Sequence, residues 1–128
     1  MFKGSIPALV TPMRDDGRID FDAWDTLLDF HLREGTDGVV VGGTTGESPV
    51  LDRAALEELV RRARRRVAGR VPVIANVAAV NTPLAVQYAE HAQKLGVDGV
   101  IAMPPYIYKE GYQVVYGLVG ADPCACPG

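Results

Sequence analysis

The pattern of hydrophobic and polar positions changes period several times along the chain, which predicts alternating strands and helices. Short apolar runs rich in branched side chains are typical of strands buried on both faces. These runs occupy residues 5–10, 38–42, 71–75 and 97–103. Between them, apolar residues recur every three or four positions, as in helices with one buried face. The first such stripe consists of Phe21, Trp24, Leu27, Leu28 and Leu32, and the second of Leu56, Leu59, Val60, Ala63 and Val67.

Residues that favour helix ends lie at the borders of these stripes. Asp20 and Asp52 precede the first two and are predicted to cap them through their carboxylates. Thr82 is predicted to cap a third helix, with Pro83 in its first position. Glycines that stop a helix follow the first and third helices, at Gly35 and Gly96. The predicted order is therefore β-α-β-α-β-α-β.

A repeat of roughly thirty residues that alternates strand and helix indicates a parallel sheet covered by helices. Two architectures satisfy it, an open doubly wound sheet and part of a (β/α)8 barrel. A complete barrel takes about 250 residues, and this chain has 128. Periodicity alone leaves both architectures open.

The composition fits one folded domain and argues against some classes of partner. Hydrophobic residues make up 48% of the chain, which is enough for a core, and the net charge is −3. That charge is too small to indicate nucleic acid or membrane partners, and a cytoplasmic location is expected. An arginine-rich stretch at 61–66 is interpreted as a solvated helix face, in which Glu57 and Glu58 pair with Arg61 and Arg62.

The segment after the second predicted strand has the composition of a ligand-binding loop. It reads Gly42-Gly43-Thr44-Thr45-Gly46-Glu47-Ser48. Glycines allow the backbone to approach a ligand and expose its N–H groups, and threonine hydroxyls donate to a carboxylate, so the loop suits a small anion. The lysine of a phosphate-binding Walker loop is absent. The alternative is a glycine-rich turn that only reverses the chain.

Four segments together resemble the dihydrodipicolinate synthase family. They are 2–13, which ends in Thr-Pro-Met, the loop Gly43-Thr-Thr-Gly-Glu-Ser48, Val73-Ile-Ala75 and Pro104-Pro-Tyr106. Their order and spacing are those of the family, and the likeness covers residues 2 to about 112. It implies a (β/α)8 TIM barrel of which the first four strands and three helices are present, with residues 1–112 forming the N-terminal half of the domain.

The resemblance also implies an activity. Members of the family are class I lyases, or aldolases, that form a Schiff base between pyruvate and a lysine. They condense the pyruvate with an aldehyde such as aspartate semialdehyde, with no cofactor and as homo-oligomers. By this likeness Thr45 holds the pyruvate carboxylate, Thr44 relays a proton, and Tyr106 lies near the active site and a subunit contact. Gly43 and Gly46 maintain the shape of the loop.

Other positions depart from the family pattern. The family's Schiff-base lysine lies on the sixth strand, and none of the three lysines here, Lys3, Lys94 and Lys109, is expected to replace it. This chain alone is therefore expected to be inactive. The alternative is a non-catalytic fragment or pseudoenzyme that binds a small carboxylate or pairs with a complementary half. A third candidate is an open-sheet anion-binding domain of another family.

Two further departures concern the tail and a set of polar positions. Residues 113–128 lack the amphipathic pattern of a helix and are interpreted as a truncated or frameshifted tail. Its Cys124 and Cys126 have no further ligand nearby, so no metal site is expected.

Lysine-inhibited family members carry polar lysine-binding groups at four positions that here are Arg53, Leu56, Val80 and Leu84. Feedback by lysine is therefore not expected.

Overall fold

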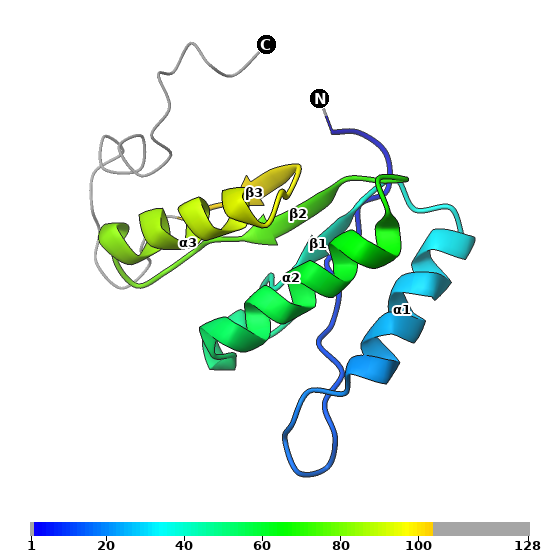
Figure 1. Cartoon of the computed structure of the whole chain (residues 1–128), viewed down its shortest axis with the longest axis horizontal. Helices are drawn as coiled ribbons and strands as arrows, with labels where there is room; N and C mark the ends of the chain where they lie inside the picture. Colours follow the sequence, from blue (N-terminus) through cyan, green and yellow to red (C-terminus); the bar gives the residue numbers. More distant parts are fainter. Residues whose placement is uncertain (1, 104–128) are drawn as a thin grey trace.

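The computed structural model describes residues 2–103, which alternate helices and parallel strands (Figure 1). The elements are α1 (Phe21–Arg33), β1 (Val39–Val41), the 3-10 turn η1 (Ser48–Val50), α2 (Arg53–Val67), β2 (Val73–Asn76), α3 (Thr82–Lys94) and β3 (Gly99–Ile101). Within this range, no helix has the length and apolar character needed to cross a membrane. The predicted tail at 113–128 lies outside the described residues.

The first two predicted helix starts are confirmed and the third is wrong by one residue. The carboxylates of Asp20 and Asp52 accept backbone N–H groups in the first turns of α1 and α2. The cap of α3 is Asn81, whose Oδ1 accepts the N–H of Leu84 at 2.9 Å, whereas Thr82 is already helical. Pro83 takes the second helical position and has no N–H to donate. The side-chain oxygen of Asn81 therefore accepts the N–H of the third helical residue, Leu84.

The three strands form a parallel sheet in the order β1-β2-β3, with Val40 beside Ile74 and Ile74 beside Gly99. The strand predicted at 5–10 is reduced to a single parallel bridge between Ala8 and Val40. Two hydrogen bonds hold it, from the N–H of Leu9 to the Val40 carbonyl and from the N–H of Val40 to the Pro7 carbonyl. Pro7 has no N–H to extend the ladder, which explains the short pairing.

The strand order and the side of the helices decide between the two architectures. A doubly wound sheet reverses its strand order at one point and carries helices on both faces. Here each strand pairs with its neighbour in sequence, and α1, α2 and α3 pack on one face (Figure 1). This is the arrangement of part of a (β/α)8 barrel.

The core lies between the helices and that face of the sheet. Residues that alternate along the strands, such as Val39, Val41, Val73 and Ala75, share one buried cluster with the helices. The predicted stripes supply the helix side, with Trp24 and Leu28 fully buried on α1. The stripe on α2 contributes Leu59, Val60, Ala63 and Val67, and its Leu56 is partly buried.

Ion pairs on the outer surface connect α2 to its neighbours. Arg62 contacts Asp25 of α1 at 3.1 Å, and the Arg66 guanidinium forms a two-pronged pair with the Asp29 carboxylate. Carboxylates therefore neutralise arginines along this face, which agrees with its interpretation as a solvated surface.

The prediction that Glu57 pairs with Arg61 is wrong. Arg61 and Arg62 both contact Glu58, at 2.7 and 3.1 Å. Glu57 instead contacts Arg53 at 2.8 Å and His91 of α3 at 3.0 Å. The reason is position around the helix, because Glu57 lies on the side of α2 that meets α3.

Replacing Asp29 by asparagine is expected to make stability less sensitive to acid. The hydrogen bond from Arg66 holds the pKa of Asp29 below its ordinary value of 3.8. A carboxylate with a lowered pKa stabilises the folded state above the unfolded pKa, and this stabilisation is lost as the pH falls through the folded value. Urea titrations of both proteins between pH 7 and about 3 measure how the free energy of unfolding depends on pH. If that free energy falls with pH as steeply in the variant as in the parent chain, the expectation is contradicted.

Candidate functional site

The loop predicted to bind a ligand begins where β1 ends, at the carboxyl edge of the sheet. It consists of residues 42–48 and leads through η1 into α2. The segment after β2 begins at the same edge, because the strands are parallel. Ligands of (β/α)8 barrels bind at this edge, so the structure places the predicted loop where a site is expected.

The loop is a pair of tight turns closed by its own backbone. The N–H groups of Gly46 and Glu47 donate to the carbonyls of Gly43 and Thr44, each at 3.0 Å. A Cβ at Gly46 would lie 2.9 Å from the carbonyl oxygen of Leu9. A Cβ at Gly43 would find only ordinary contacts, 3.6 Å and beyond. The steric reason for glycine therefore holds at Gly46 and not at Gly43.

Two buried side chains fasten this loop to the rest of the sheet. The Thr11 hydroxyl donates to the Gly46 carbonyl at 2.7 Å, from the segment that pairs with β1. At the end of β2, the amide nitrogen of Asn76 donates to the Ser48 hydroxyl at 3.0 Å. The Asn76 amide oxygen accepts the N–H of Ala78 at 3.2 Å. Asn76 thus joins the loops that follow β1 and β2.

The two threonines at the tip of the loop present donors that no other residue in the described part of the chain uses. Thr44 and Thr45 are both exposed. Within residues 2–103, neither their hydroxyls nor their backbone N–H groups form a hydrogen bond. Unused N–H and O–H donors on a constrained turn are the groups that bind a small anion. The structure thus brings Thr44, Thr45, Gly43 and Gly46 together.

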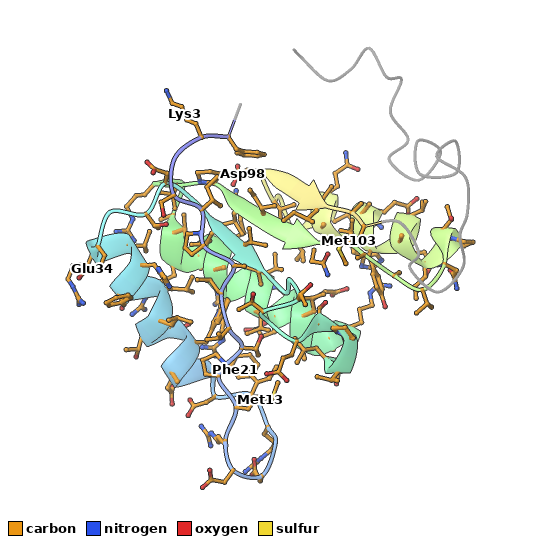
Figure 2. All side chains as sticks on the ribbon, turned by 180° about the vertical axis from the view of Figure 1, so that it is seen from behind. Lys3, Met13, Phe21, Glu34, Asp98 and Met103 are labelled. Atoms are coloured by element: carbon orange, nitrogen blue, oxygen red, sulfur yellow. The ribbon has the colours of Figure 1, made fainter. Side chains whose placement is uncertain are left out.

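The remaining candidates do not join this loop. Tyr106 and Lys109 lie outside the described residues. Lys3 precedes the segment paired with β1, at the opposite edge of the sheet, and extends into solvent (Figure 2). Lys94 is in the last turn of α3, also exposed. No group of three His, Cys, Asp or Glu side chains suited to a metal ion occurs between residues 2 and 103.

A sequence profile described as the Dihydrodipicolinate synthetase family matches residues 1–116. The chain belongs to this family. Its curated relatives include 4-hydroxy-tetrahydrodipicolinate synthase of Gluconacetobacter diazotrophicus, 46% identical over 116 residues that cover 91% of this chain and 39% of the relative. The enzyme of the same name from Pseudomonas savastanoi pv. phaseolicola is 47% identical over 109 residues, covering 85% and 37%. The chain thus spans about two fifths of the length of these relatives.

Solved structures of the dihydrodipicolinate synthetase family have the same fold. The chloride-inhibited dihydrodipicolinate synthase of Acinetobacter baumannii, solved with pyruvate, matches with a TM-score of 0.89 and 32% identity, over 94% of this chain and 43% of that one. The Aquifex aeolicus enzyme matches with a TM-score of 0.81 and 42% identity, over 91% and 39%. The partial (β/α)8 barrel is confirmed, and the candidate of an open-sheet domain from another family is wrong.

Neither Thr11 nor Asn76 was assigned a role in the site from the sequence. The sequence signal for such a role is weak, because a polar residue at a strand end can be recognised as structural only once its hydrogen-bond partners are known. Arg53 was noted only as a departure from the family pattern. In the structure Arg53 is one of the residues that line a cavity beside the loop.

Proposed function

We propose that this chain carries the pyruvate-carboxylate site of a pyruvate-dependent class I lyase, of the kind that condenses pyruvate with an aldehyde such as aspartate semialdehyde. The observation that carries the proposal is the tip of the loop after β1, where Thr44 and Thr45 offer unused N–H and O–H donors. The relative from Acinetobacter baumannii, solved in complex with pyruvate, supports the choice of anion. Thr45 binds the carboxylate, and Thr44 relays a proton.

The loop is suited to this role because it is held before a ligand arrives. The Thr11 and Asn76 hydrogen bonds fix both of its sides, so binding costs little ordering of the chain. The donors are neutral, which favours selection of a small planar carboxylate by geometry rather than by charge. Schiff-base chemistry needs an amine and no cofactor.

The isolated chain is proposed to bind pyruvate without turning it over. A Schiff base needs a lysine whose amine is close to the bound carbonyl. Lys3 lies at the opposite edge of the sheet and Lys94 on the outer helix α3. Borohydride reduction of the chain with pyruvate, followed by mass spectrometry, is expected to leave the mass unchanged. A stable adduct on any lysine would contradict this expectation.

Replacing Thr45 by valine is expected to weaken pyruvate binding about tenfold or more. One hydrogen bond to a charged group contributes about 1.5–3 kcal/mol, and valine keeps the shape of threonine without its hydroxyl. We expect the parent chain to bind with a dissociation constant on the order of millimolar. Saturation-transfer NMR with pyruvate and the unlabelled chain measures both values.

The matched control is Thr26→Val on α1, an exposed threonine whose hydroxyl bonds only to a carbonyl of its own helix. It makes the same substitution away from the loop and should leave the pyruvate affinity unchanged. Equal losses of pyruvate affinity in the two variants, or no measurable pyruvate binding by the parent chain, would argue against the proposed carboxylate site.

A second candidate function is a non-catalytic protein that binds a carboxylate or pairs with a complementary half-barrel. The observation that favours pairing is the exposure of apolar side chains on and after β3, at Val100, Ile101 and Met103. Turnover of pyruvate with an aldehyde would exclude it. Assembly into a homo-oligomer and a cytoplasmic location remain predictions, which sedimentation and cell fractionation would test.

A further inference from the structure

The N-terminal segment 5–10 forms one edge of the described sheet, beside β1 (Figure 1). Val40 of β1 bonds to the carbonyl of Pro7 and to the N–H of Leu9. Successive peptide groups of an extended strand point to opposite sides, so the N–H and C=O of Ala8 point away from β1. Within residues 2–103, neither of these two groups bonds to another backbone group.

The strand β3 forms the other edge of the described sheet (Figure 1). The N–H of Val77 donates to the Ile101 carbonyl at 2.9 Å, so the peptide groups of Ile101 face β2. By the same alternation, the N–H and C=O of Val100 point away from β2. Each edge therefore directs a backbone donor and a backbone acceptor outward.

Apolar side chains on the sheet face opposite the helices become exposed toward these two edges. On the middle strands, Val40 and Ile74 are only 6% exposed. On the same face, Val10 at one edge and Ile101 at the other are 49% and 40% exposed. In a (β/α)8 barrel this face lines the interior, which side chains from all the strands fill. The exposed positions are therefore those that lack a neighbouring strand.

Neither edge has the features that keep edge strands apart. Charged side chains and prolines are typical of protected edges, and residues 8–11 and 99–103 contain neither. Charges lie at the amino ends instead, where Figure 2 shows the exposed Lys3 before one edge and Asp98 before the other. A parallel seam between the two edges brings these opposite charges to the same end. Asp98 already pairs with Arg64, so the added charge selects the orientation more than it raises the affinity.

We propose that a second copy of this chain covers both edges, and that two copies close one eight-stranded barrel. In each seam, β3 of one copy pairs in parallel with segment 5–10 of the other, and the two seams are identical by twofold symmetry. Within residues 2–103, each copy supplies four strand positions, 5–10, β1, β2 and β3, which is half of a (β/α)8 barrel. This surface is separate from the loop at 42–48, so the inference does not depend on the pyruvate site.

Sedimentation equilibrium of the whole chain measures the assembly. We expect a species of twice the 13.7 kDa of one chain, with a dissociation constant on the order of micromolar. A monomer at high concentration would overturn the proposal. A mass that keeps growing with concentration would also overturn it, because edges that join without closing form an open sheet.

Amide hydrogen exchange, resolved by residue, locates the contact. The N–H groups of Ala8 and Val100 are expected to exchange about tenfold or more slowly in the dimer than after dilution to monomer, because they donate across the seams. The N–H of Leu9 is the internal control and should change less, since it already donates to Val40 within one chain. A dimer in which Ala8 and Val100 exchange as fast as in the monomer would use another surface, and the proposal would be overturned.

Substitutions separate the seams from the rest of the surface. Ile101→Lys is expected to weaken the dimer about tenfold or more, because it places a charge in the barrel interior. If it fails to fold, Val10→Lys tests the opposite edge independently. Phe30→Lys is the matched control, since Phe30 is similarly exposed on the outer helix α1 and its replacement should leave the dimer unchanged. An unchanged dissociation constant in a folded edge variant would overturn the proposal.

Pyruvate titration of the same samples keeps this inference apart from the proposed carboxylate site. The loop at 42–48 is held by Thr11 and Asn76 of its own chain, so each copy is expected to bind pyruvate. A parent chain that forms the dimer but binds no pyruvate would count against the proposed function alone. A chain that binds pyruvate and remains monomeric would count against the shared barrel alone.

Discussion

Replacing Trp24 by alanine is expected to destabilise the chain by about 3–5 kcal/mol. Trp24 is completely buried and is the largest side chain of the core, between α1 and the sheet. Alanine would leave a cavity that the surrounding Leu and Val side chains fill only in part. Urea unfolding followed by far-ultraviolet circular dichroism measures the change without relying on tryptophan fluorescence. Domains of this size are stable by only about 5–15 kcal/mol, so this loss is a large fraction of the total stability.

Trp24→Phe separates the ring from the indole nitrogen. Within the described residues, Nε1 of Trp24 is buried without a hydrogen-bond partner. Phenylalanine removes that unpaired donor and keeps most of the packing, so it should cost clearly less than alanine, about 1.5 kcal/mol or below. A cost equal to that of alanine would mean that the nitrogen forms a hydrogen bond essential to the fold. Phe30→Ala on the same helix is the control, because Phe30 is 46% exposed.

The second large effect is expected from Gly46→Ala, in both stability and binding. The added Cβ would lie 2.9 Å from the Leu9 carbonyl oxygen and 3.3 Å from backbone atoms of Gly42. Backbone cannot rotate away as a side chain does, so the turn must move, at a cost of about 1–3 kcal/mol. That movement also breaks the Thr11 hydrogen bond to the Gly46 carbonyl. We expect pyruvate affinity to fall at least as far as in Thr45→Val.

Gly43→Ala is the matched control for this second experiment. It adds the same methyl group three residues earlier in the same loop, where the nearest atoms lie 3.6 and 3.9 Å from the new Cβ. Stability and pyruvate affinity should change little. Similar losses in the two alanine variants would show that the loop tolerates no side chain at either position, and the steric argument from Leu9 would fail.

Most of the fold was predictable because its signals are local. The apolar stripes and the capping side chains of Asp20 and Asp52 lie within a few residues of the structure that they specify. The wrong predictions lie where adjacent residues favour different local structures. Asn81 and Thr82 are both capping residues, and only the position of Pro83 in the first turn decides between them. At 5–10 the apolar composition favoured a strand, but the missing N–H of Pro7 limits the pairing.

The candidate site was predictable in part. The composition of the loop at 42–48 indicated an anion site, and its place at the carboxyl edge follows from parallel strands. The hydrogen bonds that hold it were not predictable, since Thr11 and Gly46 are 35 residues apart and Asn76 and Ser48 are 28 apart. Likewise, the sequence gives no sign that one nitrogen of the Arg53 guanidinium has no partner between residues 2 and 103. These features depend on how distant segments meet.

The order of the strands has a consequence for how the chain folds during synthesis. Each strand pairs with the one before it, and α2, which lies between β1 and β2 in the sequence, contacts both of them. A newly made strand therefore finds its partner already translated, and the sheet can grow from the N-terminus one unit at a time as the ribosome delivers it. Contacts between such units are close in sequence, which favours fast folding. The loop at 42–48, locked by Thr11 and then by Asn76, would acquire its shape once β2 has emerged.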